Sequence, residues 1–268
     1  MARVMAAATA PVVELVNFHK ALRGELDALW SDIQRSLPAP AASPTRTAAT
    51  GTSSSSVREG LAPEQDADAD ADAALAALCR RYAFLHSAYQ CHSASEDEVV
   101  FPMLEQHVHN VGHSYTHEHE VEERLFQELQ QQLCSLRDRE AGARHPESLR
   151  GLLATAEAVR DTLLRHLCKE EQQLFPLIEK HLSLDSQREL LWKFFSSIPL
   201  TLLEQILPWM LASLQPPEQQ EMLRHLQEAV PAQDLYNTLT AIIARHGGNS
   251  GGEAGAPAPA PAALPQWV

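Results

Sequence analysis

HSASEDEVVFP, at residues 92–102, and HLCKEEQQLFP, at residues 166–176, are the two segments that decide the fold of this chain. In both, a histidine precedes a glutamate by four residues, a second acid follows directly, and a Phe-Pro pair closes the segment. Positions i and i+4 lie one turn apart on the same face of an α-helix, so each segment directs one imidazole and one carboxylate to a common region. The repeat therefore predicts two halves of one site.

Histidine and carboxylate side chains together are ligands typical of iron, manganese and zinc. Four-helix bundles hold pairs of such ions with ligands that project inward from facing helices. One His–Glu pair alone is equally consistent with an exposed pair on a helix surface, but its repetition favours a metal site. The repeated residues are His92, Glu96, His166 and Glu170.

The composition suits a folded protein. Of 268 residues, 44% are hydrophobic, which is enough for a core, and the formal charge of −14 argues against nucleic acid or an anionic membrane as the main partner. Four cysteines without a C-x-x-C pair predict neither a zinc finger nor a disulfide framework. Since the sequence shows no apolar run of membrane length and no signal-peptide pattern, we expect a nuclear or cytoplasmic protein.

An apolar stripe predicts the first helix, from Pro11 to about Leu37. Its members recur at steps of three and four residues: Val12, Leu15, Val16, His19, Leu22, Leu26, Leu29 and Ile33. A lone histidine in such a stripe is more often a hydrogen-bonded core residue than a ligand. A site with two His–Glu pairs, however, still needs ligands from the other helices, which favours His19 as one of them.

Three further amphipathic stretches predict helices at about 73–109, with a kink at Pro102, at 114–139 and at 147–181. In the second of these stretches we expect His119 rather than His117 to face inward, together with Glu122 or Glu123. The four helices predict an all-α, up-down-up-down bundle with a metal site inside.

The predicted bundle covers residues 11–182 and is interrupted by a disordered linker at 38–72, where the Asp-Ala repeat lacks the glycine and the closing glutamate of a calcium loop. Shorter helices, at about 184–195, 200–214, 217–229 and 233–245, form a C-terminal extension over 183–246. We expect them to pack on the bundle rather than to open a partner-binding groove. Disordered ends are predicted at 1–10 and 247–268.

Taken together, these stretches resemble the hemerythrin-like (HHE) family, and within it the hemerythrin domains of plant BRUTUS-type, iron-regulating RING ubiquitin ligases. The matching motifs are Phe18–Leu26, Glu96–Pro102, His113–Thr116 with His119, Lys169–Glu171 with Phe175-Pro176, and Ser197–Pro199 with Leu207–Trp209. The Leu-Pro-Trp motif is the best discriminator of the plant branch.

The resemblance implies a carboxylate-bridged diiron centre, with zinc or manganese as substitutes. Its ligands would be His19, His92, Glu96, His119, His166 and Glu170, the two glutamates bridging the ions. Oxygen-carrying hemerythrins have a further histidine where this chain has Glu123, so the resemblance does not extend to their full ligand set.

The function implied is a regulatory module that senses iron, and with it possible dioxygen binding, and that contacts transcription factors or ligase components through its helical surface. Because these residues hold no RING or zinc-finger cysteine array, we expect an excised domain or a shortened relative that does not ligate ubiquitin by itself. The alternatives are a diiron oxidase or peroxidase, an oxygen-binding protein, and a metal-free helical scaffold.

Overall fold

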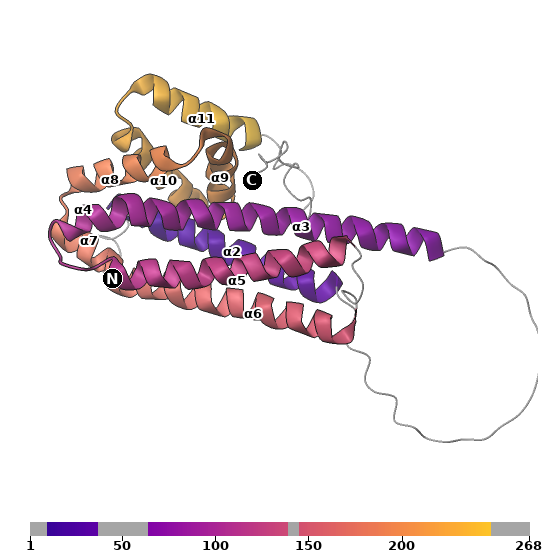
Figure 1. Ribbon diagram of the computed structural model, residues 1–268. Helices are drawn as coiled ribbons and strands as arrows, with labels where there is room; N and C mark the ends of the chain where they lie inside the picture. The colour runs from indigo at the N-terminus through magenta and orange to yellow at the C-terminus, as the bar shows by residue number, and fades with distance from the viewer. Residues whose placement is uncertain (1–9, 37–63, 139–144, 248–268) are drawn as a thin grey trace, which may run out of the picture.

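Four long helices form the body of the protein. The computed structural model describes residues 10–36, 64–138 and 145–247, and these parts contain helices and no strands. The long helices are α2 (Val13–Ser36), α3 (Glu64–Ser95), α5 (His113–Arg137) and α6 (Pro146–Lys169). Because α2 packs on α3, α3 on α5, α5 on α6 and α6 on α2, they close a ring around one core (Figure 1). The predicted all-α up-down-up-down bundle is confirmed.

Burial follows the apolar stripes of the sequence. On α2, Leu15, Leu22, Leu26 and Ile33 are at most 2% exposed, and they recur at the spacing of one helix face. Each such side chain contributes about 1.5–3 kcal/mol when it is fully removed from water. Packing of this face against the neighbouring helices therefore accounts for the stability of α2 better than helix propensity does.

Each segment of the repeat passes through a single π-helical turn. The turn η1 (Glu96–Val100) links α3 to α4 (Phe101–Glu105), and η2 (Glu170–Leu174) links α6 to α7 (Phe175–His181). In both turns the phenylalanine N–H donates to the carbonyl of the glutamate five residues earlier. The proline that follows has no N–H and crowds the carbonyl four residues before it, so the wider turn accommodates it. The kink predicted at Pro102 takes this form.

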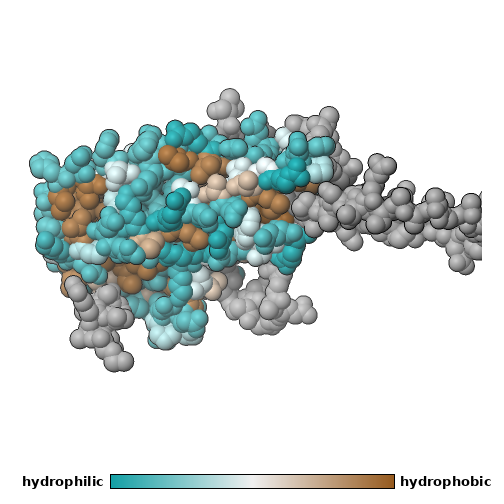
Figure 2. Space-filling model, turned by 90° about the horizontal axis from the view of Figure 1, so that it is seen from below, coloured by the Kyte–Doolittle hydropathy of each residue, from teal (hydrophilic) through white to brown (hydrophobic). Residues whose placement is uncertain are grey.

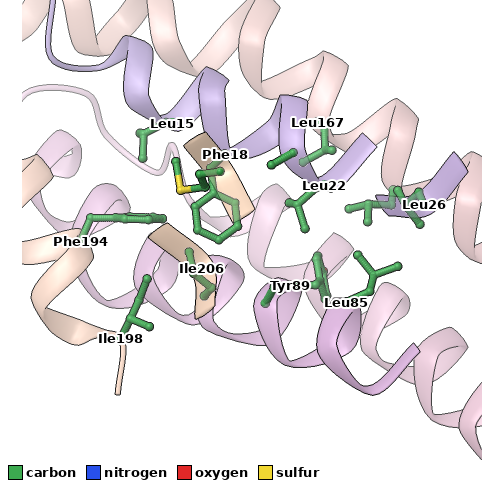
Figure 3. Close-up of a cluster of buried hydrophobic side chains, with 14 of the residues drawn as sticks. Leu15, Phe18, Leu22, Leu26, Leu85, Tyr89, Leu167, Phe194, Ile198 and Ile206 are labelled. Carbon is green, nitrogen blue, oxygen red and sulfur yellow. The ribbon is translucent and has the colours of Figure 1, made fainter. Parts of the chain in front are cut away.

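The first three helices of the C-terminal extension pack on the bundle, and the last packs on the extension itself. They are α8 (Leu184–Ser197), α9 (Leu200–Ala212), α10 (Pro216–Ala229) and α11 (Gln233–Gly247). Helix α8 contacts α3 and η1, and α9 contacts α2. Figure 3 shows Phe18 of α2 beside Phe194 and Ile206, and the Phe18 and Phe194 rings meet edge to face at 6.0 Å. The extension and the bundle therefore share one apolar core.

One boundary of the predicted linker is wrong. Helix α3 begins at Glu64, so the Asp-Ala repeat at 66–72 is helical rather than part of a linker at 38–72. Alanine is the strongest helix former, and acidic residues near a helix N-terminus interact favourably with the helix dipole. The remainder of the predicted linker, up to residue 63, lies outside the described residues, as do the predicted disordered ends at 1–10 and 247–268 except for residues 10 and 247.

The turn between α4 and α5 is shaped by two small residues. Asn110 has a positive φ of 60°, a conformation that asparagine tolerates better than most residues. A Cβ atom at Gly112 would lie 2.8 Å from the Cβ of Phe101, so only glycine allows the turn to approach this ring. The turn thus covers the phenylalanine that ends η1.

The exterior offers no large apolar face in the view of Figure 2, where small apolar patches are separated by hydrophilic side chains. Isolated apolar residues of this kind are normal on protein surfaces. Across the described residues, no helix has the length and apolar character that a membrane span requires.

Candidate metal centre

Each of the four bundle helices contributes one histidine to a cluster in the interior. His19 comes from α2, His92 from α3, His119 from α5 and His166 from α6, and none is more than 6% exposed. Four histidines that lie far apart in the sequence therefore meet in the core because each belongs to the inward face of its own helix.

The Nε2 atoms of the histidines form two close pairs. Those of His19 and His92 lie 3.1 Å apart, and those of His119 and His166 lie 3.1 Å apart. Two imidazole nitrogens that face each other at this distance need a proton or a cation between them, because two lone pairs repel. Each pair is therefore one half of a possible binding site.

Glu96 and Glu170, both completely buried, lie between the two histidine pairs. Glu96 Oε2 is 3.4 Å from His92 Nε2 and 3.5 Å from His119 Nε2. Glu170 Oε2 is 3.4 Å from His19 Nε2, and its Oε1 is 3.2 Å from His166 Nε2. Each glutamate thus faces both halves.

The six residues form two overlapping ligand sets. One comprises His19, His92, Glu96 and Glu170, and the other comprises Glu96, His119, His166 and Glu170. Within each set the ligand atoms lie within 4.8 Å of one another. The structure therefore brings together all six residues that the sequence predicted, with the two glutamates shared between the sets.

The hydrogen bonding of the glutamates fits a pair of cations. All four carboxylate oxygens of Glu96 and Glu170 are buried and accept no hydrogen bond. A carboxylate in this position is strongly destabilising unless a cation compensates it. Mixed imidazole and carboxylate donors are also the set that iron, manganese and zinc accept.

Without a cation, protons supply the compensating charge. Burial and the neighbouring Glu170 raise the pKa of Glu96 to about 8. Burial alone would lower the pKa values of His119 and His166. Asp97 and Glu96 nevertheless raise the pKa of His119 to about 10, and Glu170 raises that of His166 to about 9. A metal ion that binds here has to displace these protons.

A family comparison agrees with this geometry. Residues 55–178 match the model described as the hemerythrin HHE cation binding domain. The chain carries a hemerythrin-like HHE domain. His19 lies outside the matched residues, yet the fold places it in the centre with the other five ligands.

Curated relatives of the hemerythrin-like domain are zinc finger proteins of Arabidopsis thaliana. Zinc finger protein BRUTUS is 35% identical over 161 residues, which are 60% of this chain and 12% of that protein. Two BRUTUS-like zinc finger proteins are 36% and 34% identical over 151 and 157 residues, or 56% and 59% of this chain. The chain spans 12% of the length of each of these relatives. No solved structure gave a significant match.

Three of the four histidines of the centre share an outer arrangement, in which Nδ1 faces a carboxylate that accepts a hydrogen bond from a further donor. These chains are His19–Glu171–Arg23, His119–Asp97–Thr116 and His166–Glu118–Lys169. The imidazole–carboxylate distances are 3.0, 3.1 and 2.9 Å, respectively. Donation from Nδ1–H fixes the tautomer and turns the Nε2 lone pair toward the centre.

Two of these outer carboxylates, Asp97 and Glu171, are the second acids that follow the repeated glutamates. The sequence showed them, but their role needed the structure. Hydrogen bonds lower the pKa of both groups, despite the opposing effect of burial: Asp97 binds His119 and Thr116, and Glu171 binds His19 and Arg23. They therefore stay ionised over the physiological range.

His92 has a different environment. Its Nδ1 has no hydrogen-bond partner, and its ring stacks on Phe18 at a centroid distance of 4.8 Å and meets the edge of Phe194 at 5.7 Å. Burial, with His19 as the next contribution, lowers its pKa well below the ordinary value. His92 is thus held neutral by aromatic packing rather than by a carboxylate.

The remaining residues of α5 divide as follows. His117 is 69% exposed and pairs with Glu120, so the preference for His119 agrees with the structure. Glu122 is buried beside the centre, whereas Glu123 accepts from His86 at 3.0 Å, away from the six ligands. The sequence had left the choice between the two glutamates open.

Proposed function

We propose that this chain is a regulatory diiron module, in which occupancy of the centre by iron sets the stability of the bundle. The observation that carries the proposal is the pair of buried glutamates, shared by two histidine pairs, with four carboxylate oxygens that accept no hydrogen bond. His19, His92, Glu96, His119, His166 and Glu170 would hold the ions. Support also comes from the match to a cation-binding family and from the likeness to BRUTUS proteins.

Coupling between metal and folding follows from the burial of these ligands. A ligand that binds only the folded state, at 100 times its dissociation constant, adds about 2.7 kcal/mol to the free energy of unfolding. That is a large part of the 5–15 kcal/mol that is typical of a domain. A fall in available iron would then loosen the bundle and expose it to partners or degradation.

The resemblance to the BRUTUS type supports a role in iron homeostasis, in the nucleus or the cytoplasm, as part of or beside a ubiquitin ligase. In that role the helical surface contacts a ligase component or a transcription factor. Ligase chemistry is not proposed for the residues of this chain.

A second candidate, diiron oxidase, peroxidase or oxygen-binding protein, has one observation in its favour. Each ligand set supplies only two imidazoles and two shared carboxylates, so an iron held there would have positions open to water, dioxygen or peroxide. The protein residues would exclude bulk water and fix the imidazoles through their outer carboxylates. Repeated turnover distinguishes this candidate from the sensor, in which oxidation stops after one cycle.

The test is iron content per chain after anaerobic reconstitution with Fe(II) and desalting. The wild type and the control His117→Ala, on the exposed side of the same helix as His119, should retain two irons. His92→Ala and His166→Ala should each retain less and melt at a lower temperature than the wild type when iron is present. If the wild type retained no iron, a metal-free helical scaffold would be the remaining interpretation. Unchanged iron content and melting temperature in His92→Ala would refute the site.

A further inference from the structure

Glu122 is a buried acid that the six-residue centre does not use. It lies on α5 three residues after His119 and is 2% exposed. Its Oε2 accepts a hydrogen bond from the hydroxyl of Tyr89 at 2.5 Å, whereas its Oε1 is buried with no hydrogen-bond partner. One oxygen of this carboxylate is therefore positioned by Tyr89, and the other remains uncompensated.

The uncompensated oxygen lies on one side of the centre. Glu122 Oε1 is 3.9 Å from Nδ1 of His166, the ring that belongs to the His119–His166 half. The equivalent position in the other half, three residues after His19, is Leu22, which is completely buried and apolar. The two halves have direct ligands of the same kind, two histidines each and the two shared glutamates, but they differ at this position.

The outer carboxylates add to the difference. In the His19–His92 half, Glu171 is neutralised by Arg23 at 2.7 Å, and His92 has no carboxylate. In the other half, Lys169 neutralises Glu118, but Asp97 accepts only from Thr116 and His119. Exposure screens Asp97, at 31%, more than it screens the buried Glu122. Glu122 is therefore the main source of the charge difference.

We propose that the two metal positions are unequal, that the ion held by His119 and His166 binds first and is released last, and that Glu122 determines this order. A cation in that half lies beside a buried carboxylate in a medium of low dielectric, where charge–charge attraction is much stronger than in water. Tyr89 acts as a positioning residue, because its hydroxyl holds the carboxylate against the centre.

This inference rests on the proposed dinuclear site. It gives a physical reason for a state with one bound ion. At low iron concentration the module would hold one ion, and the second ion would bind only when the iron concentration rises. A graded response of this kind needs two affinities that differ. Repulsion between the two cations separates the steps in any such site, and Glu122 adds to the difference and decides which half fills first.

The experiment is anaerobic titration of the wild-type chain with Fe(II), with two binding steps resolved by competition against a chelator. We expect the steps to differ by an order of magnitude or more in affinity, on the strength of a buried charge. Glu122→Gln keeps the shape and an acceptor for Tyr89 but removes the charge, and it should bring the steps together by weakening the tighter one. Tyr89→Phe should shift the tighter step in the same direction by less.

Two further variants assign the steps to the halves. His19→Ala should keep one tight iron, and His119→Ala should keep only the weaker one. Glu123→Gln, one residue along the same helix, serves as the matched control and should leave both steps unchanged. Equal steps in the wild type, or unchanged steps in Glu122→Gln, would overturn the inference while leaving a dinuclear site in place. Absence of iron binding would instead remove the proposed function itself.

Discussion

Two buried arrangements of histidine and glutamate in the described part of the chain differ in one respect. In the metal centre, neither Glu96 nor Glu170 accepts a hydrogen bond. Beneath the C-terminal extension, Glu14 of α2 and His225 of α10 are equally buried, but Glu14 Oε1 lies 2.7 Å from His225 Nδ1. Its other oxygen accepts from Asn17 at 2.9 Å.

The difference shows how a structural ion pair can be told from a metal site. Both oxygens of Glu14 accept hydrogen bonds from side chains, so the pair fastens α10 to α2 without a cation. The oxygens of Glu96 and Glu170 have no such hydrogen bond, and they face the Nε2 atoms of the four histidines at 3.2–3.5 Å. Composition and burial are alike in the two places, and hydrogen bonding alone separates them.

The sharpest way to break the comparison is to replace one glutamate of each kind by leucine. Glu170→Leu should abolish retention of both irons, since Glu170 belongs to both ligand sets. In excess chelator the stability of the same variant should differ from that of the wild type by less than it does with iron, because His166, whose pKa Glu170 raises, can lose its proton once the carboxylate is gone. Iron content and denaturant unfolding measure the two effects. Retention of two irons would show that Glu170 is not a shared ligand.

Glu14→Leu should behave in the opposite way. It removes an acceptor from His225 and from Asn17, so the free energy of unfolding should fall by about 3–5 kcal/mol with or without iron. The folded fraction should still bind as much iron per chain as the wild type. Denaturant unfolding in the presence of chelator measures this change in the free energy of unfolding. A loss of stability that iron fully restores would mean that Glu14 belongs functionally to the metal centre.

The smallest expected effect is that of pH on iron affinity. Glu96 must lose its proton to bind a cation, and its pKa of about 8 in the metal-free protein means that protons compete below that value. Affinity should therefore fall as pH falls, by about tenfold from pH 8 to pH 7 for each proton displaced. The stability of the metal-free protein should depend on pH in the opposite direction. Because the pKa of Glu96 is raised by folding, its ionisation lowers the free energy of unfolding as pH rises from 4.5 to 8. Anaerobic iron titrations and denaturant unfolding curves at several pH values test the two expectations. An iron affinity that does not change with pH would contradict the role of Glu96 as a ligand that loses its proton.

Much of the fold and the six candidate ligands followed from the sequence because both depend on helix periodicity. The stripe of α2 placed His19 on the inner face, and the repeat placed Glu96 and Glu170 opposite each other. The partnership of Tyr89 with Glu122, and that of Glu14 with His225, depends instead on how helices far apart in the sequence approach one another. No local pattern encodes that approach.

Local pattern also misjudged the start of α3, where a repeat of alanine and aspartate resembles a linker in composition. The acidic residues lie near the N-terminus of a long helix, a context that the composition of the repeat does not reveal. The π-helical turns were not predicted, for a related reason. A Phe-Pro pair indicates that the helix is disturbed but not that the disturbance is a π-helical turn.

The two π turns make chain length itself a determinant of the centre. Each α-helical residue advances the direction of side chains by about 100°, so deleting a single residue between Glu96 and Phe101 would restore ordinary helical pairing and rotate everything downstream by that angle. Phe101 would swing away from the bundle, and the cover that Gly112 allows over it would be lost. The same holds for Glu170 and Phe175. Substitutions can vary around this centre, but the two segments that carry Glu96 and Glu170 cannot gain or lose a residue without displacing the helices that follow them.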